Sequence, residues 1–379
     1  MKSKPSNHSP RLLSFSLLII SSLVLAGCLP IRQFSVQPMP GNRIATAAGS
    51  PARFDGLQTE LAVAAANHCT LRVLIVHGMG IQAPGYSTGL VNQVAAKMKL
   101  RFMKESPTNT PPGEDGSVLT VRHFENGPAK LCVYELTWSP ITLPIKASQF
   151  DRDSQTPLVM SRQMINHYFK TNLVDDALSD VVLYIGQFRP KLRQPIINAI
   201  TQINQDSGRN NDPIAIITHS LGSYMVTDTL NTMDDQTAAK KYAAHVNQIF
   251  MLANQLPMLE LSDRANFRSE PAGVMTGFSQ LREAGRQQNM RNEPRRELEI
   301  VAFSDPNDLL SYELRKHDLE DGTTNGASIK GFNVRYTDEH WSILGVVSSP
   351  GNAHVNWWTD SRVPGFLADG LDANSSYEH

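Results

Sequence analysis

The sequence contains little cysteine, little net charge and no long apolar run. Three Cys among 379 residues are too few for a fold held together by disulfides. The 35 basic and 36 acidic side chains nearly cancel, which argues against a broad nucleic-acid-binding surface. A hydrophobic content of 41% excludes a disordered chain. No HExxH motif or Cys/His cluster indicates a metal, so we expect neither a metal nor a cofactor. These properties describe a globular protein.

The first apolar stretch, residues 12–25, is short and follows Lys2, Lys4 and Arg11. As a helix it would rise only ~21 Å, less than the ~30 Å hydrocarbon core of a bilayer. A basic start followed by a short apolar core is typical of an export signal. The stretch therefore predicts a cleaved leader rather than a membrane-spanning helix.

The end of this stretch, Leu25-Ala26-Gly27-Cys28, resembles the lipobox of bacterial lipoproteins. The resemblance implies cleavage after a signal peptide of residues 1–27 and lipid attachment to Cys28. In that family, a Leu rather than an Asp after the cysteine favours the outer membrane. We expect a proline-rich, flexible tether over residues 28–56 and a folded domain over residues 57–379.

The remainder alternates between strand and helix patterns. Short apolar runs predict strands at 71–76, 118–123, 131–138, 213–217, 248–253, 298–303 and 331–336. Helical spacing over about 86–104 and after residue 220 places helices between strands, which predicts one α/β domain with a mostly parallel sheet covered on both faces. The two longest connections, 140–205 and 256–297, are candidate lid insertions. The acidic pairs Asp175-Asp176 and Asp234-Asp235 are expected to be solvated or to serve packing.

Two cysteines other than Cys28 open predicted strands. Cys69 precedes residues 71–76, and Cys132 lies at the start of the run ending at Trp138. If these strands are parallel neighbours, the two sulfurs begin side by side and a disulfide is feasible. Two free thiols remain the alternative.

The strongest chemical signal is Ser220 in the sequence Thr218-His219-Ser220-Leu221-Gly222. A serine between a buried strand and a helix projects its hydroxyl above the sheet, and the helix N-terminus favours developing negative charge. Gly222 meets the requirement for a small residue, whereas Thr218 stands where glycine is usual. The alternative is a serine that only caps the helix.

A second motif, His77-Gly78-Met79-Gly80, ends an earlier predicted strand, and together the motifs resemble those of the α/β-hydrolase fold and its lipases and esterases. The resemblance covers about residues 70–360. It implies an oxyanion hole from the backbone N–H groups of Met79 and Leu221, with His77 structural. A phosphate-binding glycine loop fits less well, because Tyr86 stands where a P-loop requires lysine.

The acid and the base should follow Ser220 in that order in this fold. Asp308, followed by an apolar pair, is the preferred acid, and Asp305 is the alternative in the same loop. His354, in a loop before an aromatic pair, is the preferred base, and His340 is the alternative. We expect His317 and His379 to be solvated.

The order Ser220, Asp308, His354 implies acyl transfer through an acyl-enzyme. The expected substrate is a carboxylic ester, such as a lipid or an acylated envelope component. An amidase, thioesterase or acyltransferase would use the same residues. A non-catalytic binding or scaffold lipoprotein on the same fold is the alternative from another class.

Overall fold

The computed structural model describes residues 35–38, 53–107, 116–154, 166–167, 170–208, 211–263, 274–289, 296–305, 308–315, 329–335, 354 and 356–372. The centre of the fold is a nine-stranded sheet with the order β1-β10-β9-β8-β7-β3-β6-β5-β4. Its strands are β1 (Ser35–Pro38), β3 (Leu71–Val76), β4 (Arg101–Pro107), β5 (Val118–Asn126), β6 (Ala129–Thr137), β7 (Ile214–His219), β8 (Val246–Leu252), β9 (Leu298–Ser304) and β10 (Ile329–Arg335). A second, two-stranded sheet pairs β2 (Arg53–Asp55) with β11 (Gly370–Asp372).

The six strands from β10 through β6 are parallel to their neighbours, and β1, β5 and β4 pair antiparallel. The predicted α/β class with a mostly parallel sheet is therefore confirmed, in the form of a mixed sheet. None of the described helices is long and apolar enough to span a bilayer.

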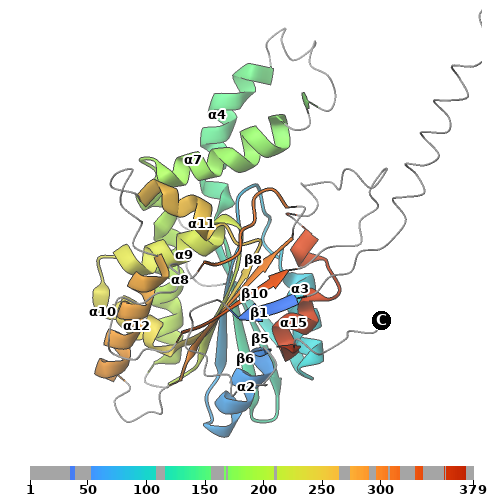
Figure 1. The fold of residues 1–379 in the computed structure, drawn as a ribbon, viewed down its shortest axis with the longest axis vertical. Coiled ribbons are helices and arrows are strands. Elements are labelled where there is room, and N and C mark those ends of the chain that lie inside the picture. Colours follow the sequence, from blue (N-terminus) through green and yellow to red (C-terminus); the bar gives the residue numbers. More distant parts are fainter. Residues whose placement is uncertain are drawn as a thin grey trace, which may run out of the picture.

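Helices cover both faces of this sheet because its central strands are apolar on both sides. Along β3, Leu74 and Val76 face one core and Val73 and Ile75 the other. Figure 1 shows the two helical layers on opposite sides of the sheet. One layer contains α8 (Arg189–Ser207), α9 (Leu221–Thr232), α10 (Gln236–His245) and α12 (Val274–Asn289), and the other α2 (Leu57–Ala66), α3 (Thr88–Lys97) and α15 (Val363–Asp369).

Further helices occupy the described parts of both predicted insertions. The first insertion contains α4 (Leu143–Ser154), the π-helix η2 (Lys170–Leu178), α7 (Ser179–Ile185) and α8. The second contains α11 (Leu256–Leu259), the 3₁₀ helix η3 (Glu260–Asp263) and α12. Figure 1 shows α4 and α7 stacked beyond one end of the sheet. Their action as lids stays a prediction.

The order of the strands marks a place for chemistry. From β3 the sheet is extended in one direction by β6, β5 and β4 and in the other by β7, β8, β9 and β10. The helix after β3 (α3) and the helix after β7 (α9) lie on opposite faces. Connections that diverge in this way leave a crevice at the carboxyl ends of the two strands, where ligands bind in open α/β sheets.

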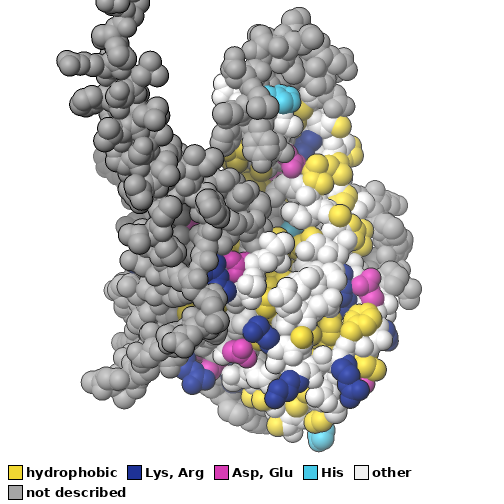
Figure 2. All heavy atoms as spheres, turned by 90° about the vertical axis from the view of Figure 1, so that its right-hand side faces the viewer, with side chains coloured by type: hydrophobic (Ala, Val, Ile, Leu, Met, Phe, Trp, Pro, Cys, Tyr) yellow, Lys and Arg dark blue, Asp and Glu magenta, His cyan; other side chains and the backbone are white. Residues whose placement is uncertain are grey.

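Charges of both signs are interspersed over the coloured part of the face in Figure 2. This distribution agrees with a formal net charge of −1. The described part of this face therefore lacks the single-sign field that would attract a polyanion.

The helix predicted over 86–104 is too long. α3 ends at Lys97, and Lys99 adopts a left-handed φ of 58° that turns the chain away from the helix. Residues from Arg101 onward form β4, which pairs antiparallel with β5. Helical spacing alone could not place the end of the helix, because Met98 and Phe102 are four residues apart and therefore fit the helical period as well.

The predicted tether of residues 28–56 contains two strands, which is a correction. β1 pairs with β10, and β2 pairs with β11. Phe54 of β2 is fully buried and its ring packs against Phe250, Phe303 and Phe332. The ordered domain therefore begins before Leu57. Cys28 and the predicted signal peptide lie outside the described residues.

Cys69 and Cys132 are not joined by a disulfide. The strands are parallel neighbours as expected, but Cys132 pairs in register with Arg72 rather than with Cys69. An offset of three residues corresponds to about 10 Å along a strand. This exceeds the Cα separation that a disulfide can bridge.

Candidate active site

Ser220 occupies a strained turn between β7 and α9. Its φ of 54° and ψ of −126° lie in a region that residues with a side chain rarely adopt. Such strain costs on the order of 1–3 kcal/mol and persists where the surroundings enforce it. Here the Ser220 N–H donates to the Leu252 carbonyl of β8 at 2.8 Å. The turn thus holds the serine at the carboxyl end of β7, beside the end of β3.

Two glycines allow β3 and α9 to approach this closely. A Cβ on Gly222 would lie 2.7 Å from the carbonyl oxygens of both Val76 and His77. A Cβ on Gly78 would lie 2.5 Å from the Ser220 Cβ. Both positions therefore require glycine for space, and the second places the Gly78–Met79 backbone directly against the serine.

The unusual Thr218 fits because its hydroxyl is satisfied locally. Thr218 Oγ1 and Ser223 Oγ are 2.9 Å apart, and the same hydroxyl lies 3.4 Å from the Phe250 carbonyl. A residue larger than glycine is therefore accommodated at position 218, because its buried hydroxyl has hydrogen-bond partners.

The structure joins Ser220, His354 and Asp308 in one hydrogen-bonded chain. Ser220 Oγ lies 2.8 Å from His354 Nε2, and His354 Nδ1 lies 2.8 Å from Asp308 Oδ2. All three side chains are buried, and Ser220 is 0% exposed. This arrangement fits an imidazole that donates from Nδ1 to the carboxylate and accepts the serine O–H at Nε2. A serine, a base and an orienting acid in this relation are what nucleophilic catalysis requires.

Of the two candidate acids, Asp308 makes the contact with His354. Its other carboxylate oxygen accepts the Leu310 N–H at 2.9 Å, and its own N–H donates to the Asp305 carbonyl at 3.0 Å. Asp305 thus shapes the loop through its backbone. Of the two candidate bases, His354 reaches Ser220, whereas His340, His317 and His379 lie outside the described residues.

His219, the residue before the serine, holds the candidate base His354 in place and was missed as a site residue. Its Nε2 donates to the His354 carbonyl at 2.7 Å. Burial, reinforced by the neighbouring His354, lowers the pKa of His219 to about 3. The ring therefore stays neutral and keeps this donor near neutral pH. The only signal in the sequence was its position beside Ser220.

His77 has the structural role that the motif implied. Its Nε2 accepts the Trp138 N–H at 3.1 Å, its Nδ1 lies 2.7 Å from the Gly78 carbonyl, and its ring stacks on Trp138 with centroids 4.8 Å apart. Burial lowers the pKa of His77 to about 3, so the imidazole is neutral. The ring fixes the loop that leads to Met79.

A group of charged residues in the first insertion contacts the same loop. Asp180 Oδ2 accepts the Gly80 N–H at 2.8 Å, and Asp176 Oδ2 accepts the Ile81 N–H at 3.2 Å. Lys146 pairs with Asp176 at 2.9 Å and with Asp180 at 2.8 Å. The interpretation of the Asp175-Asp176 pair as solvated or packing residues therefore missed the contact that Asp176 makes.

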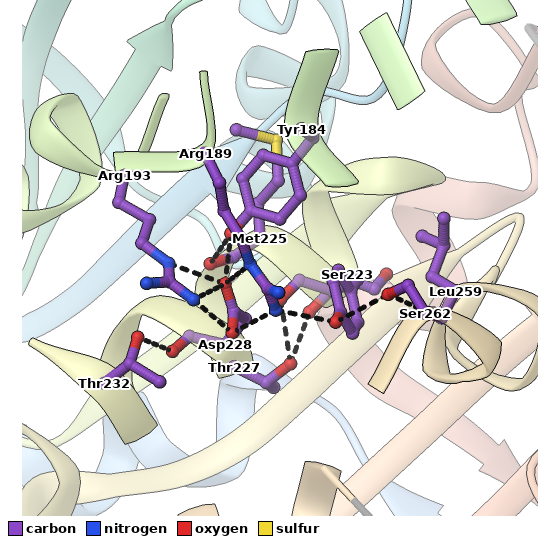
Figure 3. A network of polar contacts seen from close by, with 11 residues as sticks. Tyr184, Arg189, Arg193, Ser223, Met225, Thr227, Asp228, Thr232, Leu259 and Ser262 are labelled. Carbon is purple, nitrogen blue, oxygen red and sulfur yellow. Dashed lines mark hydrogen bonds and ion pairs between the residues drawn. The ribbon is translucent and has the colours of Figure 1, made fainter. Parts of the chain in front are cut away.

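A second charged group ties the first insertion to α9 (Figure 3). The carboxylate of Asp228, on α9, pairs with Arg189 and Arg193, each at 2.6 Å, and accepts the Tyr184 hydroxyl at 2.7 Å. Arg189 also donates to the Tyr224 hydroxyl at 2.7 Å. Because α9 begins at the serine turn, these contacts fix the insertion relative to Ser220.

The other acidic pair lies away from the site. Asp235 caps α10 by accepting the Ala238 N–H at 3.0 Å. Among the described residues, no group of three or more His, Cys, Asp and Glu side chains is arranged to hold a metal ion.

Comparison with known proteins gave no relative: no family model, no curated protein and no solved structure matches this chain.

Proposed function

We propose that the protein is a serine hydrolase that cleaves carboxylic esters. The observation that carries the proposal is the chain of contacts from Ser220 through His354 to Asp308, at 2.8 Å each. A serine that only caps a helix needs neither the strained φ of Ser220 nor a buried imidazole bonded to a carboxylate. The position at the diverging connections of β3 and β7 also favours a ligand site.

In the proposed reaction, His354 Nε2 takes the proton of Ser220 Oγ as this oxygen attacks the ester carbonyl. Asp308 stabilises the resulting imidazolium. The tetrahedral oxyanion accepts hydrogen bonds from the N–H groups of Met79 and Leu221. Collapse breaks the bond to the alcohol oxygen, which receives the proton from His354. Water then attacks the acyl-enzyme with the same proton transfers and releases the carboxylic acid and free Ser220.

The proposal includes the α/β-hydrolase fold and envelope attachment. The fold is supported by the parallel sheet, the turn at Ser220 and the glycine loop after β3. Attachment is supported by the lipobox-like sequence ending at Cys28, and we infer a lipid-anchored protein of the outer membrane. Replacing Cys28 with Ser should release the protein from membranes, and retention after signal removal would count against a lipid anchor.

The complete burial of Ser220 favours one alternative, a binding protein whose pocket stays closed. Fluorophosphonate labelling of the detergent-solubilised full chain separates the two. For the hydrolase, we expect one modified residue, Ser220, with labelling lost in Ser220→Ala and His354→Ala. Ser223→Ala is the matched control, because this buried serine lies three residues along the same turn and contacts Thr218. His340→Ala should also retain labelling.

The substrate class is tested with p-nitrophenyl esters of increasing acyl length and with matched thioesters and anilides. Hydrolysis of esters ahead of thioesters and anilides, lost in Ser220→Ala, is the expected result. A folded wild-type protein that neither reacts with fluorophosphonate nor hydrolyses any ester would refute the hydrolase and support the binding protein. Transfer of the acyl group to an added alcohol in preference to water would identify an acyltransferase instead.

A further inference from the structure

The loop that follows β3 is held on two sides. On one side, Gly78 packs against Ser220 so closely that a Cβ there would lie 2.5 Å from the serine Cβ. On the other side, the peptide N–H groups of Gly80 and Ile81, two and three residues further along the chain, donate to carboxylates of the first insertion. Met79, whose N–H belongs to the proposed oxyanion hole, lies between these two restraints.

The two carboxylates reach the loop together because they are four residues apart. Asp176 lies in η2 and Asp180 at the start of α7, so both can face the same side of the continuous helical segment. Nine residues of π-helix are uncommon, and π-helical turns occur frequently at functional sites. The adjacent Asp175 instead pairs with Lys170, at 2.6 Å.

Lys146 of α4 forms an ion pair with each of these acids in a largely buried setting. Its side chain is 8% exposed and that of Asp180 is 0% exposed. Burial raises the pKa of the Asp180 carboxyl, and the Lys146 ammonium opposes this rise by favouring the charged form. An ionised carboxylate is also the stronger acceptor for the Gly80 N–H. Asp176, Asp180 and Lys146 thus form one unit, which we name the loop clamp.

We propose that the loop clamp positions the oxyanion hole, with Asp180 as its main positioning residue. The Asp180 contact fixes the peptide between Met79 and Gly80, and this restrains the backbone that carries the Met79 N–H. The first insertion is then a structural part of the active site. This inference rests on the proposed function of Ser220, His354 and Asp308.

If the loop clamp positions the oxyanion hole, its loss should affect kcat in a way that a purely structural role would not. The oxyanion exists only after Ser220 has attacked, so loss of positioning should reduce kcat and leave KM nearly unchanged. A displacement of about 1 Å at a catalytic group can cost about 100-fold in rate. We therefore expect Asp180→Ala to lower kcat by about 10- to 100-fold. Asp180→Asn, which keeps an acceptor oxygen for the Gly80 N–H, should recover part of the loss.

The experiment uses the detergent-solubilised full chain and p-nitrophenyl butyrate as the probe ester. Asp175→Ala is the matched control, because it removes a neighbouring carboxylate that pairs with Lys170 rather than with the loop. Binding of a trifluoromethyl ketone, which forms an oxyanion on Ser220, should weaken in Asp180→Ala in proportion to the loss in kcat/KM. Circular dichroism and thermal unfolding report whether each variant is folded.

Asp176→Ala provides a second variant in case Asp180→Ala does not fold, since the Asp176 side chain is 30% exposed. It should lower kcat less than Asp180→Ala and more than Asp175→Ala. Equal kcat values in folded clamp and control variants, or an increase in KM alone, would overturn the inference while leaving the hydrolase intact. A wild-type chain without labelling at Ser220 would overturn the hydrolase, and the inference with it.

Discussion

Replacing Gly78 with Ala tests the geometry around Ser220 with a single methyl group. The new Cβ would lie 2.5 Å from the Ser220 Cβ and 2.8 Å from the His219 carbonyl oxygen, whereas ordinary contact begins at 3.4 Å. The backbone of residues 78–79 must therefore move away from the serine by about 0.9 Å, which is the difference between 3.4 Å and 2.5 Å. Gly78 does not have a positive φ, so crowding rather than backbone strain is the perturbation.

The retreat carries the Met79 N–H away from the oxyanion that forms on attack by Ser220. A misplacement of about 1 Å costs about 100-fold, so we expect kcat for p-nitrophenyl esters to fall by about that factor, with KM nearly unchanged. Overpacking should also lower the free energy of unfolding by about 1–3 kcal/mol. Steady-state kinetics and urea denaturation of the same preparations measure both effects.

Gly89→Ala is the matched control for this change. Gly89 lies in α3, and a Cβ there would meet nothing within 4 Å. Alanine is favoured over glycine in a helix by about 0.5–1 kcal/mol, so this variant should be slightly more stable and fully active. A folded Gly78→Ala protein with the kcat of Gly89→Ala would refute the assignment of the Gly78–Met79 backbone to the oxyanion hole.

Three further changes test the acid, a buried amide and a buried carboxyl. Asp308→Asn should lower kcat by about 10³–10⁴-fold, because an amide no longer orients and stabilises the His354 imidazolium; ester hydrolysis measures the loss. Gln255→Leu should raise the free energy of unfolding by about 1–3 kcal/mol, measured by urea denaturation, because neither amide atom of this buried side chain has a hydrogen-bond partner among the described residues. Burial, with the nearby Asp55 carboxylate, raises the pKa of Glu299 to about 7 from 4.5. The folded state then binds the extra proton between these values, so stability should fall from pH 4.5 to about 7, and Glu299→Gln should flatten this dependence in denaturation curves.

Each of these changes has a neighbour that serves as its control. Asp305→Asn should leave activity near wild type, because Asp308 rather than Asp305 contacts His354. Asn254→Leu should destabilise, because the Asn254 side chain bonds to Leu256 and Tyr312. Glu297→Gln should keep the pH dependence. Destabilisation by Gln255→Leu, or an unchanged pH profile in Glu299→Gln, would contradict the buried states assigned to these groups.

The features that the sequence could predict are those encoded locally. An apolar strand followed by a serine, a glycine and a helix defines the turn at Ser220 within a few residues. The same holds for the glycine loop after β3. The preference for Asp308 over Asp305 also used local information, the apolar pair that follows it, and the structure places Asp308 against His354.

The features that the sequence could not predict depend on register and long-range contact. β1 gains its partner β10 almost 300 residues later, so its four residues look like part of a proline-rich tether. Cys69 and Cys132 each open a strand predicted from the sequence, but only the pairing of Arg72 with Cys132 reveals that their sulfurs are offset. Neither fact changes the local pattern of apolar and polar residues.

Asp175 and Asp176 show most clearly which contacts the sequence could not predict. They are adjacent, chemically identical and part of the same π-helix, so composition and spacing predict the same role for both. In the fold, Asp175 pairs with Lys170 on its own helix, whereas Asp176 pairs with Lys146 of α4 and with the backbone of Ile81. The difference arises because the insertion packs over the end of β3, and no residue near either aspartate encodes that placement. A carboxylate four residues later, Asp180, completes the contact, and a buried ammonium makes it energetically tolerable. The residues of the proposed chemistry can thus be read from motifs, whereas the carboxylates of Asp176 and Asp180, which contact the loop after β3, are defined only by tertiary packing.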